Sequence, residues 1–457
     1  DTIFISTNRN SLYHARVSNL NINKIKERRI MALILLLFIF LLIFGTPIVF
    51  SLGVAASFTL VAYDVPLALV AQKIYGGLDK FTIMAIPFFI LTGIIMEKGG
   101  IAKRIIDFAT ALVGWITGSL YLVAVVAGTG LAAISGSGSA DTAAMSSIML
   151  PQMKKRNYNI DFSAAIMACS GSLGTIIPPS IMMVVLATIS NQSVGALFLA
   201  GIIPGLICAL FLLISGYLRA KTNLSESKDY HKFSTVYLIK TFISAIPALT
   251  LPVIIVGGIV GGIFTPTEAA SVAVITGLFI SLFIYREIKF KDLPQIILRA
   301  ATIASTVMLI IATANIFSWF IASQQIPQKI SEFMLGFSDS KLWFLMNVNI
   351  LLILIGMFME SISAILILVP VLMPVAIAFG VDPLHFGLII ILNLSIGMVT
   401  PPYGITLFVA SSIAERSIVD VSKKLLIPLS LMFLVLFLAT YFPKISLYLP
   451  STILGYK

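Results

Sequence analysis

Apolar stretches alternate with short polar breaks along almost the whole chain. Many of them reach or exceed the roughly 17–25 residues that an α-helix needs to cross a bilayer. Some are too long for one span and must contain two elements. The pattern therefore predicts an all-α polytopic membrane protein with about eleven or twelve spans. The apolar stretches are 30–63, 81–97, 102–134, 162–190, 194–219, 236–260, 267–285, 293–322, 342–379, 385–414 and 425–448.

Two adjacent prolines interrupt this pattern twice, in "GTIIPPSI" (174–181) and in "GMVTPPYG" (397–404). The two proline pairs are 223 residues apart, and Pro151 and Pro374 share that offset. Offsets of 224 or 225 residues relate four more pairs upstream: Ser137 and Ser361, Ser139 and Ser363, Asp107 and Glu332, and Phe108 and Phe333. The matches follow one order, which predicts a duplicated chain. In secondary transporters, duplicated halves with matching broken helices place the binding site at the repeat interface.

Each proline pair removes backbone donors from a helix. The first pair is expected to leave the carbonyls of Gly174 and Thr175 without donors, and the second pair those of Gly397 and Met398. Broken backbone inside a membrane is tolerated where protein, water or an ion satisfies it. Free carbonyls beside a hydroxyl, such as that of Thr400, form an oxygen cage for Na⁺. The alternative is a proline kink that neighbouring helices satisfy.

A Ser-rich stretch precedes each break, "SGSGSADTAAMSS" (135–147) and "MESIS" (359–363). Gly and Ser are poor residues for a helix interior but supply oxygens and allow close backbone approach. The first stretch predicts a helical hairpin that enters and leaves on one side, with its tip at 135–140. Carboxylates inside a membrane indicate function, and Asp141 and Glu360 lie beside the breaks. For Asp141 a role as a helix N-cap is the alternative.

A third motif, "GGIFTPTEAA" (261–270), has the composition of a helix start. Thr265 as the N-cap, Pro266 at the first helical position and Glu268 three residues after the cap predict a capping box. A place for Glu268 beside the transport path is the functional alternative.

Composition agrees with this class, because 59% of the residues are hydrophobic and 11% are charged. The net charge of +11 comes from Lys and Arg in short polar breaks such as 154–156 and 423–424, as expected for cytoplasmic loops rather than for nucleic-acid binding. The chain contains no P-loop motif for ATP. Its two cysteines lie in apolar runs and its three histidines are isolated, so Na⁺ is the only metal expected. The Ser-rich tips lack a nearby His or Lys base, which argues against an enzyme.

Four stretches, 85–114, 132–153, 174–181 and 261–270, together resemble the large membrane (M) subunit of tripartite ATP-independent periplasmic (TRAP) transporters. The likeness covers nearly everything after residue 31 and is strongest to the sialic acid permeases. It implies the ion-transporter-superfamily fold, in which each of two repeats has a re-entrant hairpin and a Pro-Pro-broken helix. It further implies an elevator-type carrier of the bacterial inner membrane that takes up an organic acid with Na⁺ and needs no other cofactor. A periplasmic substrate-binding protein and a small membrane subunit are the implied partners.

The resemblance and the internal repeat together predict the organisation of the chain. Met31 directly precedes the first apolar run, so we expect the preceding residues to join a small subunit fused upstream. The expected parts are 1–30, a polar and basic linker or fusion helix; 31–80, N-terminal scaffold helices; 81–219, repeat 1 with a hairpin at about 135–160 and a broken helix at about 162–190; 220–305, connecting scaffold helices; 306–448, repeat 2 with a hairpin at about 356–380 and a broken helix at about 385–414; and 449–457, a C-terminal tail.

The family places two sodium sites at the hairpin tips and the proline breaks. The first would comprise Ser135, Ser137, Gly174, Ile177 and Pro178. The second would comprise Gly356, Gly397, Thr400 and Pro401, to which the internal repeat adds Ser361. The residues expected to face the substrate are Ser139, Asp141, Thr175, Ser180, Glu268, Glu360 and Tyr403.

The hydroxyl-rich first tip favours sialic acid (N-acetylneuraminate), a polyhydroxylated monocarboxylate. Neither tip carries an Arg that could clamp a second carboxylate in two places. The alternatives are a C4-dicarboxylate TRAP permease and a Na⁺/dicarboxylate symporter that needs no binding protein. The duplicated breaks argue against the permease of an ATP-driven importer.

Overall fold

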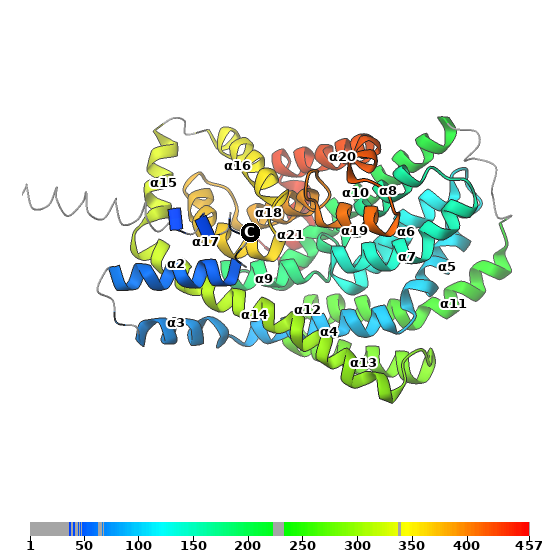
Figure 1. The fold of residues 1–457 in the computed structure, drawn as a ribbon, viewed down its shortest axis with the longest axis horizontal. Coiled ribbons are helices and arrows are strands. Elements are labelled where there is room, and N and C mark those ends of the chain that lie inside the picture. Colours follow the sequence, from blue (N-terminus) through cyan, green and yellow to red (C-terminus); the bar gives the residue numbers. More distant parts are fainter. Residues whose placement is uncertain are drawn as a thin grey trace, which may run out of the picture. The chain divides into compact units, whose positions relative to one another are not determined.

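The computed structural model describes residues 36–37, 40–41, 44, 46, 48–62, 66, 68–222, 233–336 and 340–456. Every regular element within these ranges is a helix (Figure 1). The chain divides into a smaller body, Asp1–Asp79 with Met308–Gln324, and a larger body, Lys80–Val307 with Gln325–Lys457. The predicted linker or fusion helix, 1–30, lies outside the described residues.

In the described part of the chain, seven helical segments are long and apolar enough to cross a membrane. The sequence pattern predicts eleven or twelve spans. Four further apolar helices of the described part are too short to be counted among the seven: Ser119–Ser135, Ile181–Ser190, Lys341–Gly356 and Pro383–Gly397. The seven are Phe81–Lys98, Val194–Thr222, Thr235–Val260, Pro266–Ile284, Phe290–Ser323, Ser361–Ala378 and Ile418–Tyr441.

The smaller body contains α2 (Ile48–Ala62), α3 (Ala68–Leu78) and the last part of α14 (Leu293–Ser323). Its buried centre is Ile316, against which Leu69, Val70, Ile74 and Trp319 pack. The side-chain amide of Asn315 donates a hydrogen bond of 2.6 Å to the carbonyl of Lys73 and so ties α14 to α3.

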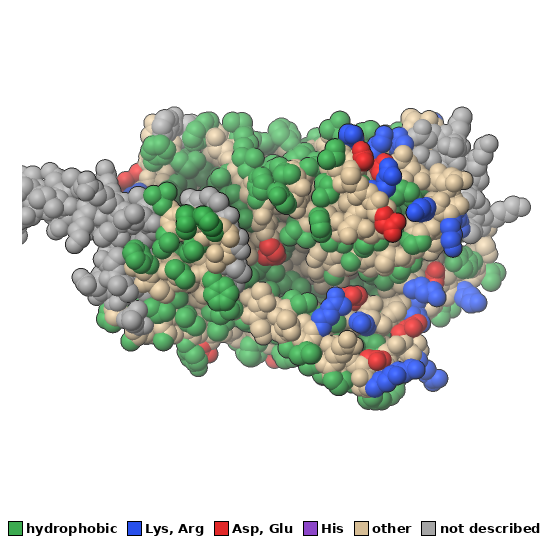
Figure 2. Space-filling model, in the orientation of Figure 1, with side chains coloured by type: hydrophobic (Ala, Val, Ile, Leu, Met, Phe, Trp, Pro, Cys, Tyr) green, Lys and Arg blue, Asp and Glu red, His purple; other side chains and the backbone are tan. Residues whose placement is uncertain are grey.

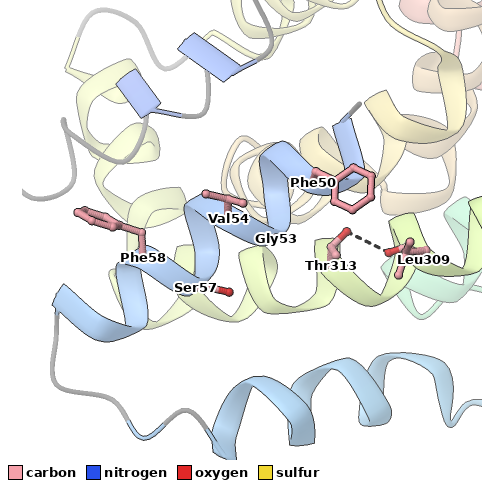
Figure 3. A pocket seen from close by; sticks show the side chains of 7 residues that line it. All are labelled: Phe50, Gly53, Val54, Ser57, Phe58, Leu309 and Thr313. Atoms are coloured by element: carbon pink, nitrogen blue, oxygen red, sulfur yellow. Dashed lines mark hydrogen bonds between the residues drawn. The ribbon is translucent and has the colours of Figure 1, made fainter. Parts of the chain in front are cut away.

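An apolar groove of about 490 Å³ runs between α2 and α14 in this body (Figure 3). Its lining residues are Phe50, Gly53, Val54, Ser57, Phe58, Leu309 and Thr313. The hydroxyl of Thr313 donates back to the carbonyl of Leu309 at 3.0 Å and is not free for a ligand. Such a lining suits hydrocarbon rather than a charged group.

The larger body is built from helices that recur along the chain, with starting residues 222–225 positions apart. The hairpin arms α7 (Gly138–Lys155) and α17 (Ser361–Ala378) match at 223 at both ends and carry Pro151 and Pro374 at the same place. The other matching pairs are α5 (Ile101–Val113) and α15 (Ile326–Leu335), α6 (Ser119–Ser135) and α16 (Lys341–Gly356), α8 (Ile160–Ser172) and α18 (Pro383–Gly397), α9 (Ile181–Ser190) and α19 (Ile405–Ile413), and α10 (Val194–Thr222) and α20 (Ile418–Tyr441).

Helices α6 and α7 pack together as one hairpin, and α16 and α17 form the other. The first tip is Gly136–Ser137, inside the predicted range, and the second is 357–360. The arms begin at Ser119 and Lys341, earlier than the expected 135 and 356. The first difference arises because the turn before α6, "GWITG" (114–118), has few polar residues and is hard to separate from the apolar run around it.

Each broken helix consists of two short helices joined by the proline segment, α8 to α9 and α18 to α19. The peptide bonds Pro178–Pro179 and Pro401–Pro402 are both cis. Helix α7 packs against α8 and α19, and its counterpart α17 packs against α18 and α9. Each hairpin therefore contacts the broken helices of both repeats, as a two-fold relation between the halves requires.

The remaining elements of the larger body surround this core. Helix α4 (Ala85–Lys98) packs chiefly against α13 (Pro266–Phe279). The others are η1 (Phe81–Met84), η2 (Leu173–Thr175), α11 (Thr235–Pro252), η3 (Val253–Gly257), α12 (Gly258–Val260), η4 (Ile280–Ile284), η5 (Phe290–Asp292) and α21 (Lys444–Leu454). In Figure 2 the Lys and Arg side chains gather over the right-hand part of this body, around α5, α10, α13 and α20. Such a concentration of basic side chains is what the positive-inside rule predicts for the cytoplasmic side of a membrane protein.

Candidate functional site

The first hairpin tip is held together by hydroxyl and carboxylate groups. The hydroxyl of Ser135 donates to Oδ1 of Asp141 at 2.6 Å, and the backbone N–H of Ser137 donates to the Ser135 hydroxyl at 3.1 Å. Asp141 is only 3% exposed. Its position beside Ser135 groups it with the first predicted sodium set rather than with an open substrate surface.

The first proline break lies directly against this tip. A Cβ atom added to Gly174 would be 2.5 Å from Oδ2 of Asp141. Gly136, at the tip, has a φ of +63°, and a Cβ there would be 2.6 Å from the carbonyl oxygen of Pro179. Both positions require glycine because two backbones and a carboxylate meet at less than side-chain distance.

The second tip meets the second break in a similar way. A Cβ atom on Gly397 would be 2.7 Å from the Cα of Gly356, at the end of α16. Ser361, the first residue of α17, is 2% exposed. Gly356 and Gly397 thus lie in close contact at the second tip, as Gly174 and Asp141 do at the first tip.

Each tip leaves a buried side-chain oxygen without a hydrogen-bond partner among the described residues. At the first tip it is Oδ2 of Asp141, and at the second it is the hydroxyl of Ser361. A buried polar atom without a partner costs about 1–3 kcal/mol and calls for a ligand or an ion. Each candidate sodium set therefore contains one oxygen that the fold itself does not satisfy.

The carbonyls behind the prolines differ from our expectation, because three of the four accept hydrogen bonds. The Thr175 carbonyl accepts from the Ser180 hydroxyl at 2.8 Å. The Gly397 carbonyl accepts from the Thr400 N–H, and the Met398 carbonyl accepts from both the N–H and the hydroxyl of Thr406. Ser180 and Thr406 follow the prolines, where the chain turns back and brings their donors into reach, whereas Thr400 donates within the turn before Pro401. Of these four carbonyls, that of Gly174 alone accepts no hydrogen bond from the described residues.

The pairing of Ser137 with Ser361 also needs correction. Because α7 and α17 match at an offset of 223, Ser361 corresponds to Gly138. Ser137, the N-cap of α7, corresponds to Glu360, the N-cap of α17. The offset of 224 taken from the sequence was one residue too long at this place, since Ser recurs at every second position of the first tip.

The two tip carboxylates have different roles in their helices. Glu360 caps α17, because its Oε2 accepts from the N–H of Ser363 at 2.9 Å. Asp141 is the fourth residue of α7 and caps nothing, so the N-cap alternative for Asp141 is wrong. The sequence offered a cap as the alternative for Asp141 and not for Glu360, because both carboxylates lie next to Gly- or Ser-rich sequence.

The remaining predicted residues fall into buried and exposed groups. Thr175 and Ser180 are 3% and 1% exposed, and both hydroxyls are engaged inside the break, Thr175 donating to the Ser172 carbonyl. This placement does not favour direct substrate contact. Ile177 and Pro178 are buried in the same break, whereas Pro401 is partly exposed. Thr400 donates its hydroxyl to the Ile396 carbonyl at 2.7 Å.

Four residues of the predicted substrate set remain accessible, Ser139, Glu268, Tyr403 and the cap residue Glu360. Ser139 is partly exposed on the first turn of α7. Tyr403 is 69% exposed, and its ring lies 5.9 Å from the ring of Phe358 at the second tip. Phe358 was missed because an aromatic residue in apolar sequence gives no signal of its own. Glu268 forms the predicted capping box with Thr265, at the start of a helix that packs on α4 rather than at the hairpin tips.

Residues 35–445 match the profile of a family described as "Tripartite ATP-independent periplasmic transporter, DctM component". The chain belongs to this family. This TRAP permease is 41% identical to the C4-dicarboxylate large permease DctM of Rhodobacter capsulatus and 39% identical to the sialic acid large permease SiaM of Vibrio cholerae. In both cases the matched region covers 91% of this chain and 97% of the relative.

A third relative is considerably longer than this chain. The isethionate permease DctMQ of Oleidesulfovibrio alaskensis is 41% identical over 90% of this chain, but this chain spans only 65% of that protein. Among solved structures, the YdaH transporter of Alcanivorax borkumensis superposes with a TM-score of 0.57 at 16% identity, covering 82% of this chain and 88% of that one. This likeness supports the fold alone.

Family membership fixes the broad class of the molecule. The TRAP permease is a multi-pass protein of the bacterial inner membrane and a transporter component, not an enzyme. The names of its relatives refer to different substrates, namely C4-dicarboxylates, sialic acid and isethionate. These relatives are nearly equally identical in sequence to this chain.

Proposed function

We propose that the TRAP permease couples the inward movement of Na⁺ to the uptake of an organic acid. The observation that carries this proposal is the pair of unsatisfied buried oxygens, Oδ2 of Asp141 and the hydroxyl of Ser361, one at each hairpin tip. Carboxylate, hydroxyl and carbonyl oxygens are the ligands of hard cations. The two sets lie at the places where broken backbone faces a hairpin, as in transporters that bind ions at discontinuous helices.

In the first set, Asp141 and the free carbonyl of Gly174 supply the strongest ligands, and Ser135 holds Asp141 in place. Ser137, Ile177 and Pro178 complete this set through their backbone. In the second set, Ser361 contributes the hydroxyl, and Gly356, Gly397, Thr400 and Pro401 contribute backbone or hydroxyl oxygens. The carboxylate of Asp141 makes the first set more attractive to a cation than the second.

We place the substrate between the two tips, with Ser139 and Glu360 nearby and the exposed rings of Phe358 and Tyr403 at the second tip. Aromatic faces suit the apolar face of a sugar ring. Sialic acid is therefore the first substrate to test. A C4-dicarboxylate is the second, because relatives of equal identity bear that name.

We further propose that a periplasmic binding protein delivers the substrate and that a small membrane subunit accompanies this chain. The fused DctMQ relative, which is longer than this chain, supports a small subunit that is either separate or joined upstream. The elevator movement of a transport unit against a scaffold belongs to this proposal.

Uptake into proteoliposomes tests the function. The permease and its small subunit are reconstituted and given labelled sialic acid or succinate, with and without the cognate binding protein, under an inward Na⁺ or K⁺ gradient. Uptake that needs both Na⁺ and the binding protein is expected. Uptake of free dicarboxylate without the binding protein would favour the self-sufficient symporter, and ATP-dependent uptake indifferent to Na⁺ would overturn the proposal.

A further inference from the structure

A small cavity lies beside the first tip, and no residue of the proline break lines it. Its volume is about 20 Å³, which is enough for one water molecule or one bare cation. Three polar side chains line it, Ser135, Asp141 and Glu97. The rest of the lining is apolar: Gly93, Met96, Ile101, Ala102, Leu131, Ile134, Ala140 and Ala144.

Two carboxylates, those of Asp141 and Glu97, line this cavity. Asp141 is 3% exposed, and its Oδ2 has no partner among the described residues. The Glu97 side chain is 32% exposed at the end of α4, where Nη1 of Arg299 lies 3.0 Å from its Oε1. The cavity thus borders both the first candidate sodium set and a carboxylate that reaches solvent.

The solvent end faces the cytoplasm. Lys98 follows Glu97 directly, and Lys103 and Arg104 lie one turn further on, in α5. Basic residues of this kind mark the cytoplasmic side. An apolar passage disfavours a cation unless charges compensate the lost hydration, and the only formal negative charges on this lining are those of Asp141 and Glu97.

We propose that this cavity is the cytoplasmic branch of the cation path to the first sodium set. Glu97 is its outer cation ligand, and Arg299 is a tethered cation that neutralises Glu97 when no ion is passing. This inference rests on the proposed Na⁺ coupling. It adds a cytoplasmic route for Na⁺, a cation ligand on α4 (Glu97), and a side chain on α14 (Arg299) that competes with Na⁺ for that ligand.

Neutralising Glu97 and neutralising Arg299 should shift the half-saturating Na⁺ concentration in opposite directions. Glu97→Gln leaves Arg299 uncompensated near the path, so Na⁺ should bind more weakly. Arg299→Gln leaves two uncompensated carboxylates, so Na⁺ should bind more tightly. Each shift should be about three- to tenfold in the half-saturating Na⁺ concentration, the scale of one partly screened unit charge at an effective dielectric constant of about 20. The double variant should return close to the wild type.

Thermal unfolding of the purified full chain in NaCl against choline chloride measures these shifts. Arg104 and Glu287 form the matched control, because they make a similar pair at 3.4 Å near the same side and do not line the cavity. Arg104→Gln and Glu287→Gln should leave the Na⁺ dependence unchanged. Shifts of the same sign for Glu97→Gln and Arg299→Gln, or no shift, would overturn the inference while Na⁺-dependent stabilisation of the wild type still stands. No Na⁺-specific stabilisation of the wild type would overturn the proposed coupling itself.

A filling variant tests passage separately from charge. Ala102 lines the cavity from α5 and is 6% exposed. Ala102→Leu should slow exchange of ²²Na⁺ across proteoliposomes severalfold without moving the half-saturating concentration. Exchange at the wild-type rate, with stability in choline chloride also at the wild-type level, would overturn the route.

Discussion

The hydroxyl of Ser395 donates a hydrogen bond of 2.9 Å to the carbonyl of Ser172, and the two residues are 223 positions apart in the sequence. That separation is the offset of the internal repeat, so each residue is the counterpart of the other. A contact between counterparts lies on the pseudo-two-fold axis that relates the halves. Both serines are fully buried, in α18 and α8, where the two broken helices approach each other.

Ser395→Ala should lower the stability of the protein by about 1 kcal/mol, the usual net value of one buried hydrogen bond. The loss stays modest because the Ser172 carbonyl also accepts from the Thr175 hydroxyl at 2.7 Å. Thermal unfolding in detergent measures it. Ser430→Ala is the control, because its hydroxyl donates to the carbonyl of Leu426 within an exposed part of α20. Equal losses in the two variants would contradict a special role of the axis contact.

Gly174→Ala should weaken the response to Na⁺, because the new Cβ would lie 2.5 Å from Oδ2 of Asp141 and displace it. A displacement that costs about 1.4 kcal/mol of binding raises the half-saturating Na⁺ concentration about tenfold. Na⁺-activated uptake measures this. Pro178→Ala should act in the same direction, since it restores a backbone donor to the free Gly174 carbonyl.

Gly257→Ala is the control for Gly174→Ala, because a Cβ at Gly257 meets nothing within 4 Å. Its Na⁺ activation should equal that of the wild type. If Gly174→Ala also kept the wild-type activation, the first sodium set would be wrongly assigned.

Glu360→Gln should impair uptake more than Lys155→Gln, because the first removes a negative charge at a hairpin tip and the second removes an exposed positive charge at the far end of α7. Glu360→Ala should in addition lower stability by about 1 kcal/mol, since it removes the N-cap of α17. Uptake rates and thermal unfolding separate the two effects. Equal uptake by the two Gln variants would show that the charge of Glu360 has no role in transport beyond capping α17.

Tyr403→Ala should raise the concentration of binding-protein-delivered sialic acid needed for half-maximal uptake, whereas Tyr403→Phe should keep it. The loss of one stacking ring is worth about 0.5–1.5 kcal/mol, or about two- to tenfold. Phe437→Ala is the control, because Phe437 and Tyr441 form an exposed aromatic pair on α20 at 4.7 Å. If Phe437→Ala raised this concentration as much as Tyr403→Ala does, the assignment of Tyr403 to the substrate site would be wrong.

The sequence predicted the broad architecture well, because its signals were long or repeated. The apolar runs indicated helices, and the doubled proline pairs located both breaks to the residue. Thr265, Pro266 and Glu268 predicted their capping box correctly, since all of its partners lie within four residues. Local chemistry of this kind needs no knowledge of the tertiary fold.

The site depends on contacts that the sequence does not encode locally. Ser180 and Thr406 satisfy the Thr175 and Met398 carbonyls only because the chain reverses after each break. The approach of Gly174 to Asp141 and the cavity beside Glu97 join segments that are more than thirty residues apart. The pattern of hydrophobic residues gives no measure of such distances.

The different registers of Asp141 and Glu360 bear on the origin of the two halves. One lies four residues into α7, and the other precedes α17, so they are not copies of a single ancestral carboxylate. The proline pairs keep one register in the two halves, at an offset of 223, whereas the two carboxylates do not. Each tip therefore carries its negative charge at a different distance from the start of its helix, and the two candidate sodium sets are not chemically equivalent.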